Sequence, residues 1–335
     1  MQQNQTLIVP PIEFRIACAD CLKLSWTIAA LAVSSVVVAI LMASSGPGLD
    51  ILGKGSLIYL LILAVLALIR YRFRFADQGT SRFVRDFAEY TGLFIFVSLL
   101  CAAASYLLAA ASSGYSDPVL ARIDALLQFN WLAWYELVAA HPALQTAGRI
   151  AYANIYFSPL ILMAAFAHSG ARERAQCLLV SFWLAAIITL TLFVTMPAVG
   201  PLSYLWQGPI PYMPTSGTFQ ADLLPALRDR SSGPLDLGNL EGLVCAPSFH
   251  STSAILYMVM GWGHRKIRWP LIGLNSAMLL ATPVEGTHYL IDMIGGVFVA
   301  IVALCLTSLT LSLLSGKKML ISSGQSRMPA GALAA

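Results

Sequence analysis

The sequence predicts an all-α fold, a polytopic membrane helical bundle of about eight transmembrane helices. Of its 335 residues, 58% are hydrophobic and only 11% are charged, and the mean hydropathy is +0.75. Soluble domains are nearer to roughly 45–50% apolar and 25% charged residues. The net charge of +4 is spread between the apolar runs, so we expect no nucleic-acid partner.

Eight apolar runs approach the roughly 20 residues that cross a bilayer. The second and seventh runs are short and need a thinned bilayer or burial among neighbours. The first 24 residues are polar with balanced charge, so we expect no cleavable signal. In chain order the runs are Leu24–Ser44, Gly55–Ile69, Tyr90–Ala111, Ile150–Ala167, Cys177–Val194, Ala246–Trp262, Leu271–Thr282 and Tyr289–Leu314.

The basic residues predict the orientation, because loops rich in Lys and Arg stay in the cytoplasm. Fifteen of the 20 lie at the two ends of the chain or in one alternating set of loops. Both termini are therefore expected to be cytoplasmic. The opposite side holds only Lys54, Arg122, Arg149, Arg228 and Arg230.

Two loops on that opposite side are long. Residues 112–148 contain apolar residues at helical spacing, followed by Trp131 and Trp134. They indicate either an amphipathic helix in the membrane interface or a helix packed on the spans. Residues 195–245 are rich in Pro and Gly and are either a lid over a site or a plain connector.

Two short strings carry the chemistry. Pro247-Ser248-Phe249-His250-Ser251 opens the sixth run, and Gly286-Thr287-His288 opens the eighth, with Asp292 four residues later. Ionisable residues at membrane helices usually face a protein interior or a wet cavity and mark function. In the predicted orientation both histidines reach the same, non-cytoplasmic surface.

These residues suit phosphoryl transfer. On a helix, Asp292 shares a face with His288 and can fix its tautomer, which leaves one ring nitrogen free as nucleophile or base. A helix starting after Ser248 favours an anion at its N-terminus, and Ser248 and Ser251 add hydroxyl donors. Gly286 leaves room for a bulky group. One histidine would attack phosphorus while the other protonates the leaving oxygen.

Two other interpretations remain open. The histidines could be hydrogen-bonded parts of the bundle, or His250, His288, Asp292 and Glu285 could hold a metal ion. Cys18 and Cys21 form one C-x-x-C pair with no second pair nearby, which is too few ligands for a structural zinc site. Of these interpretations we favour none over phosphoryl transfer, and because that reaction requires no metal, we expect neither a metal nor a cofactor. We assign no catalytic role to the three remaining histidines, His141, His168 and His264.

Pro-Ser-x-His followed by His-x-x-x-Asp resembles two signature motifs of the type 2 phosphatidic acid phosphatase superfamily. The strings Pro247–Ser251 and His288-Tyr289 with Asp292 are most similar to the branch of inositol phosphorylceramide and sphingomyelin synthases. The resemblance covers residues 90–315 and implies a six-span catalytic domain there. It would follow a cytoplasmic N-terminus with two accessory spans (1–89) and precede a cytoplasmic tail (316–335).

The resemblance implies that His288 is the nucleophile that forms a phosphohistidine, that Asp292 orients it, that His250 is the acid for the leaving group and that Ser248 contacts phosphate. The phosphatases' Lys-x6-Arg-Pro motif is missing, and Thr282 stands where they carry an arginine. Other cations must then meet the phosphate charge. Our candidates are Arg149, Arg228 and Arg230, each of which could instead be structural.

We therefore expect an integral membrane enzyme, of the inner or plasma membrane if bacterial, that acts on a phospholipid or isoprenoid phosphate at the non-cytoplasmic leaflet. The branch resemblance favours a phosphotransferase like inositol phosphorylceramide synthase. A phosphatidate or isoprenoid-diphosphate phosphatase is the alternative within the family. A non-enzymatic lipid or anion transporter is the alternative from another class, although the broken helices in matching halves that would indicate it are not evident. The sequence does not predict an oligomeric state.

Overall fold

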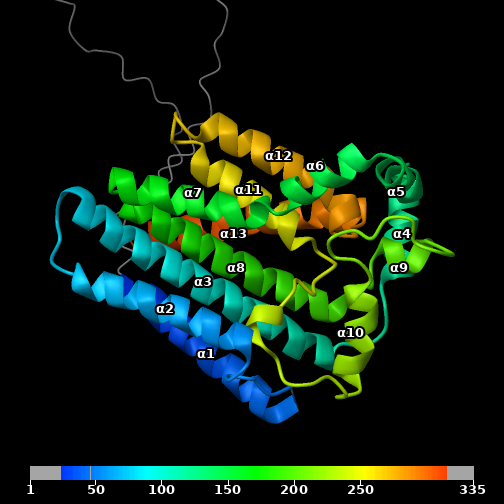
Figure 1. Cartoon of the computed structure of the whole chain (residues 1–335), viewed down its shortest axis with the longest axis horizontal. Helices are drawn as coiled ribbons and strands as arrows, with labels where there is room; N and C mark the ends of the chain where they lie inside the picture. The colour runs from blue at the N-terminus through cyan, green and yellow to red at the C-terminus, as the bar shows by residue number, and fades with distance from the viewer. Residues whose placement is uncertain (1–23, 46, 315–335) are drawn as a thin grey trace, which may run out of the picture.

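The structure is a computed structural model that describes residues 24–45 and 47–314, and within these ranges it is all-α (Figure 1). The fold class predicted from the sequence is thus confirmed. The N-terminal residues with Cys18 and Cys21, and the tail from 316, lie outside the described ranges. The helices are α1 Leu24–Ser45, α2 Lys54–Arg72, α3 Gly79–Ala111, α4 Asp117–Leu126, α5 Trp131–Ala139, α6 Pro142–Tyr152, α7 Asn154–Ser169, α8 Arg172–Thr195, α9 Pro201–Leu205, α10 Phe219–Arg228, α11 Phe249–Gly261, α12 Arg268–Glu285 and α13 Leu290–Leu314.

Every apolar run predicted from the sequence contains a helix, but the helices differ in length. Among the described residues, five helices (α1, α2, α3, α8 and α13) are long and apolar enough to cross a membrane, and α6 with α7 makes a sixth if this pair, bent by 41°, is one span. Helix α11 has only 13 residues. It is shorter than predicted because Ala246 and Pro247 precede the helix and Ser248 caps it.

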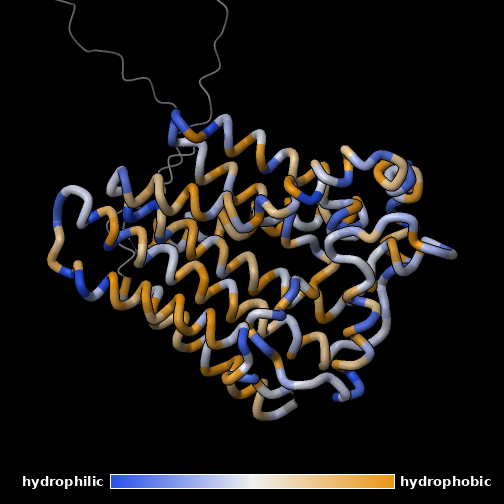
Figure 2. The backbone as a smooth tube through the Cα atoms, in the orientation of Figure 1, coloured by the Kyte–Doolittle hydropathy of each residue, from blue (hydrophilic) through white to orange (hydrophobic). Residues whose placement is uncertain are grey.

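The bundle is built around one apolar core. Helices α3, α7, α8, α11 and α13 contribute to it, and side chains such as Leu162, Phe166 and Leu178 are fully buried there. On the outside, apolar residues of α2 such as Leu61 and Leu68 are both 65% exposed. Figure 2 shows that hydrophobic residues continue along α1 and α2. Exposed apolar helix faces are the surface expected to contact lipid.

Three loops with many basic residues meet at one end of the bundle. Arg70 at the end of α2 and Arg172 at the start of α8 both pair with Glu89 of α3. Arg174 of α8 lies 3.4 Å from the ring of His264 in the α11–α12 turn. The sequence placed these loops on one side of the membrane, and the structure places them together. Which leaflet they face stays a prediction.

The first two helices are attached to the long loop that leads to His250. Asp236 accepts hydrogen bonds from the Gly55 backbone and from the Ser56 hydroxyl, at 3.1 and 3.2 Å. A Cβ on Gly55 would lie 2.3 Å from the Gly238 Cα, so the two backbones touch where only glycine fits. The start of α2 is therefore joined in space to the long loop.

Candidate active site

Helix α11 begins at a tightly fixed point. The Ser248 hydroxyl caps the helix by accepting the Ser251 N–H at 3.4 Å, and the Ser248 N–H donates to the Asp292 carbonyl of α13 at 2.9 Å. A Cβ on Gly296 would lie 2.2 Å from the Ser248 carbonyl oxygen, so α13 needs glycine to approach this closely. His250, the second residue of α11, is positioned by both helices.

His288 lies in the turn before α13, and its partner Asp292 lies in the first turn of that helix. The prediction that both residues sit on one helix face was wrong in this detail. Their contact nevertheless forms, with His288 Nδ1 3.3 Å from Asp292 Oδ2. The Tyr289 N–H donates to the same oxygen at 3.1 Å. Both side chains are buried, so the Nε2 atom of His288 is the ring nitrogen left without this partner.

The two histidines face each other across a short gap. Their ring centroids are 6.1 Å apart and the rings are inclined by 58°. His288 is 2% exposed and His250 is half-buried. They approach from the start of α11 and from the turn before α13, at the end of the bundle away from the Arg70–Glu89 pairs (Figure 1). The structure therefore brings together the two motifs that the sequence singled out.

Tyr152, the last residue of α6, is a neighbour of His250 that the sequence analysis missed. Its ring stacks on the imidazole with centroids 4.1 Å apart and an interplanar angle of 19°. Its hydroxyl lies 3.2 Å from His250 Nδ1 and 3.2 Å from the Ser216 hydroxyl. No short-range pattern could reveal this contact, because 98 residues separate the two side chains.

Gly286 has a different role from the one expected. A Cβ there would lie 2.6 Å from His288 Cδ2 and 2.9 Å from the Tyr152 hydroxyl. The space next to Gly286 is thus filled by two side chains of the site, and not kept open for a ligand. Glycine at this position lets Tyr152 and His288 approach the same backbone.

Glu285 ends α12 and fastens the long loop beside the histidines. It accepts hydrogen bonds from the Tyr212 hydroxyl at 2.5 Å, from the Thr215 N–H at 3.1 Å and from the Thr215 hydroxyl at 2.7 Å. Burial and this carboxylate raise the pKa of Tyr212 to about 12. Both Glu285 oxygens are occupied by donors, which does not fit the metal-ligand role weighed for it.

Cys245 joins the histidine–aspartate pair. Its thiol donates to Asp292 Oδ2 at 3.6 Å, and the ligand atoms of Cys245, His288 and Asp292 lie within 4.8 Å of one another. Burial raises the pKa of this thiol well above its usual range, and metal ions bind the thiolate. Cys245, His288 and Asp292 thus form one hydrogen-bonded cluster, and a metal ion there would have to displace the proton of the thiol.

Two of the three candidate arginines donate hydrogen bonds to residues of another loop. Arg149 donates to the Tyr212 hydroxyl at 3.0 Å and to the Met213 carbonyl at 3.1 Å. Arg228 donates to the Ser112 hydroxyl and the Gly114 carbonyl, and Arg230 is exposed in a left-handed conformation with φ 54°. None of these contacts reaches a histidine. Arg149 is linked to the site through Tyr212 and Glu285.

The two candidate serines differ in their contacts. The Ser248 hydroxyl is engaged as the cap of α11. The Ser251 hydroxyl is buried and, among the described residues, has no hydrogen-bond partner. A Cβ on Gly296 would lie 3.0 Å from Ser251 Cβ, so Ser251 packs against α13.

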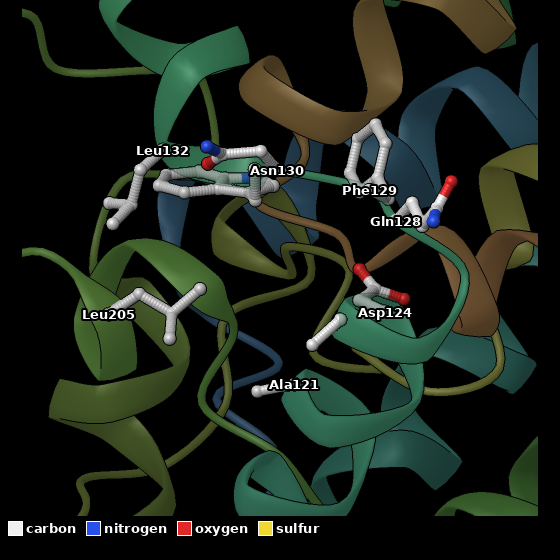
Figure 3. Close-up of a pocket in the computed structure, with 9 residues that line it drawn as sticks. Ala121, Asp124, Gln128, Phe129, Asn130, Leu132 and Leu205 are labelled. Carbon is white, nitrogen blue, oxygen red and sulfur yellow. The ribbon is translucent and has the colours of Figure 1, made fainter.

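A separate open cavity of about 380 Å³ lies between α4, α5 and α9 (Figure 3). Asp124 borders it and, with its two carboxylate oxygens, accepts the backbone N–H groups of Leu290 and Ile291 at 2.8 and 2.9 Å. These bonds fix the start of α13, two residues after His288. Trp131, also at the cavity, is 2% exposed and donates to the Pro283 carbonyl, so this loop is packed on the spans.

A helical membrane bundle with two facing histidines, one of them backed by an aspartate, defines a class of enzymes that transfer phosphoryl groups. The sequence profile of the PAP2 superfamily matches residues 118–306, more than half of the chain. The chain belongs to this superfamily, and a phosphatase or phosphotransferase type of function follows from the membership. The match includes both histidine motifs and leaves out α1 and α2. No curated protein and no solved structure matches the chain.

Proposed function

We propose that this chain transfers the phosphoryl group of a membrane lipid through a phosphohistidine on His288. The observation that carries the proposal is the 6.1 Å separation of the two imidazole rings, with an aspartate behind only one of them. A phosphorus about 3–3.5 Å from one nitrogen, with its leaving oxygen in hydrogen-bond reach of the other ring, fits this gap.

The first step uses the difference between the two histidines. Asp292 holds Nδ1 of His288, so Nε2 attacks phosphorus as the bond to the leaving oxygen breaks. His250 gives its proton to that oxygen, which is otherwise a poor leaving alkoxide. The first turn of α11 offers backbone N–H groups to the phosphate oxygens, as helix N-termini do for anions.

The second step resolves the intermediate. His250, now neutral, takes a proton from the incoming water or alcohol as that oxygen attacks the phosphohistidine and the N–P bond breaks. Water gives a phosphatase and a lipid hydroxyl gives a transferase. Within this proposal Arg149, linked to the site through Tyr212, is our first candidate for a cation near the phosphate. Arg228 and Arg230 are secondary candidates.

The test uses purified protein in detergent with a radiolabelled phosphatidate. We expect His288→Ala to abolish both turnover and the acid-labile, alkali-stable label on the protein. His250→Ala should slow turnover by about 10²–10⁴-fold. His141→Ala, which changes an exposed histidine, is the matched control. Full turnover by His288→Ala would overturn the proposal, and loss in His141→Ala would show that the assay reports general damage.

We further propose that the acceptor is a lipid hydroxyl, as in inositol phosphorylceramide synthases. The support is the motif: Phe249, which stands between Ser248 and His250, packs edge-on against Phe182 with ring centroids 5.1 Å apart. This phenylalanine is therefore part of the core. It stands where the Pro-Ser-x-His motif of the phosphatases has glycine, and this departure resembles the inositol phosphorylceramide and sphingomyelin synthase branch.

The acceptor can be identified from the products. Labelled phosphatidylinositol is supplied with and without ceramide or diacylglycerol. A labelled lipid product that depends on the acceptor supports the transferase, whereas release of free phosphate from phosphatidate alone supports the phosphatase. Vanadate, which mimics the pentacoordinate phosphoryl group, should inhibit either enzyme. Transport of lipid without any turnover would favour the non-enzymatic alternative.

We also propose that residues 90–315 form the catalytic unit, with both termini in the cytoplasm and the histidines on the other side. The support is the gathering of the basic loops at the end of the bundle opposite the histidines. Reporter fusions inserted after Lys266 and after Gly233 should report opposite sides of the membrane. The same side for both would contradict this orientation.

A further inference from the structure

We infer that Tyr152 positions His250, the proposed acid, so that the two histidines are held by partners of different charge. A carboxylate holds His288, and a neutral phenol holds His250. This inference rests on the proposed function and adds a residue to it. It concerns α6, a helix on which the sequence motifs give no sign of such a role.

Two contacts orient the His250 ring. The parallel stacking of Tyr152, with centroids 4.1 Å apart, fixes the plane of the imidazole. The hydroxyl at 3.2 Å from Nδ1 fixes its rotation within that plane. With Nδ1 engaged by tyrosine, Nε2 is the atom left to reach the leaving oxygen. The ring of Tyr152 is itself buried, with 7% exposed.

Tyr152 is fixed in turn by the long loop. Its hydroxyl lies 3.2 Å from the Ser216 hydroxyl, and the Ser216 N–H donates to the Glu285 carbonyl at 2.9 Å. A phenol both donates and accepts. It can therefore accept the Nδ1–H of His250 while it donates to Ser216. The neighbouring Glu285 carboxylate is occupied by Tyr212 and Thr215 and does not compete for this hydroxyl.

With Tyr152 in this role, each proton of His250 can be followed through the first step. In its charged form, His250 carries Nδ1–H toward Tyr152 and Nε2–H toward the leaving oxygen. As the P–O bond breaks and the N–P bond to His288 forms, the Nε2 proton moves to the leaving oxygen and His250 becomes neutral. Nδ1–H and the phenol proton stay in place throughout. Nε2 is then free to accept the proton of the next nucleophile.

The charge of each partner suits the role of each ring. A carboxylate stabilises an imidazolium and orients a nucleophile, as in other histidine–aspartate pairs. A phenol orients the ring without adding a negative charge, so it does not hold the proton that an acid must release. If Tyr152 only filled space, its substitution would slow the reaction of all substrates alike. If Tyr152 positions the acid, its substitution slows most the substrates with a poor leaving group.

The experiment compares two phosphate monoesters, phosphatidate with an alkoxide leaving group and p-nitrophenyl phosphate with a good one. Tyr152→Phe keeps the ring and removes the hydroxyl. We expect kcat/KM to fall about 10–100-fold for phosphatidate and no more than about threefold for p-nitrophenyl phosphate, because only the first needs a proton from a general acid. Tyr90→Phe, at a buried tyrosine whose hydroxyl has no hydrogen-bond partner in the described part of the chain, should change neither.

The variants distinguish a failure of this inference from a failure of the proposed function on which it rests. If His288→Ala keeps activity, the proposed function fails. If His288→Ala and His250→Ala behave as proposed but Tyr152→Phe lowers both substrates equally, or neither, the inference about Tyr152 is overturned. Should Tyr152→Phe not fold, Ser216→Ala replaces it in the same assay. That variant should show a smaller loss with the same preference for the poor leaving group, and an equal loss for both substrates would overturn the inference.

Discussion

The two ends of the bundle hold their buried carboxylates in different ways. At the basic end, Glu89 is shared by Arg70 and Arg172. At the end with the histidines, Asp117, Glu285 and Asp124 are held by backbone N–H and hydroxyl donors. At the basic end, charged partners connect whole helices. At the end with the histidines, neutral partners fix individual turns of the backbone around the candidate site.

This difference means that equivalent substitutions have different consequences at the two ends. An acid paired with arginine stabilises the packing of helices. An acid that holds loops and a histidine determines where the atoms of the proposed site lie. We therefore expect losses of activity at one end and losses of stability at the other.

Among the substitutions that compare the two ends, the largest effect is expected for Asp292→Asn. The amide is close in shape but presents an N–H or a neutral oxygen to His288 Nδ1, so the ring loses both its orientation and its charged partner. Activity toward phosphatidate should fall about 10³–10⁴-fold, while thermal unfolding in detergent changes little. Near-normal turnover in the Asp292→Asn variant would contradict the proposal that Asp292 distinguishes His288 from His250.

Glu285→Gln should come next. The amide can accept the bonds of Thr215 through its oxygen but meets the Tyr212 hydroxyl with an NH₂ group. The loop from Tyr212 to Ser216 then loosens, and with it the second partner of Tyr152. We expect about a 10-fold loss of kcat/KM, comparable to about 1–2 kcal/mol for one buried donor left unmatched. Rapid proteolysis of this loop in the variant, monitored by mass spectrometry, would locate the change.

Glu89→Gln is the matched substitution at the other end. The side chain of Glu89 is 6% exposed, but Arg70 and Arg172 are 33% and 43% exposed, so water screens part of the loss. We expect about 1–2 kcal/mol of lost stability, seen as a lower unfolding temperature. Turnover per folded molecule should stay within about twofold by the same reasoning. A large loss of turnover without destabilisation would contradict the expectation that substitutions at the basic end lower stability and not activity.

The smallest effect concerns Cys245. Because burial raises the pKa of its thiol well above the usual range, the thiolate that reacts with maleimides is scarcer at neutral pH than for an ordinary cysteine and increases as the pH rises. In the folded protein at pH 7.5, N-ethylmaleimide should leave Cys245 unmodified after times that modify it fully in SDS, as read by peptide mass spectrometry. Equal labelling in both conditions would show that the histidine–aspartate cluster is open to solvent.

The sequence predicted the parts of the structure that local patterns determine. Each of the eight apolar runs contains a helix, although only five helices of the described residues, or six with the bent α6–α7 pair, are long and apolar enough to cross a membrane. The basic loops predicted which turns gather at one end. The Pro-Ser and His-x-x-x-Asp strings located the facing histidines, because each string lies where a helix begins.

Contacts between distant segments could not be predicted from local sequence patterns. Tyr152 meets His250 across 98 residues, and Trp131 meets Pro283 across 152. Nothing in the spacing of either segment encodes such a pairing. Arg149 looked like a phosphate ligand from its position at a span mouth, but the fold directs it to Tyr212. His288 was expected on the helix but lies two residues before α13, because Thr287 adopts φ 50°, which a continuous helix does not allow.

The shortness of α11 bears on how deep in the membrane the proposed reaction would take place. Its 13 residues measure about 20 Å along the axis, while the hydrocarbon layer is about 30 Å thick. In the proposed orientation, with the turn at 265–268 at one membrane surface, the imidazoles would lie below the opposite headgroup layer and not level with it. A lipid phosphate would then have to sink toward the acyl chains to be cleaved, and water would be scarce where the phosphohistidine forms.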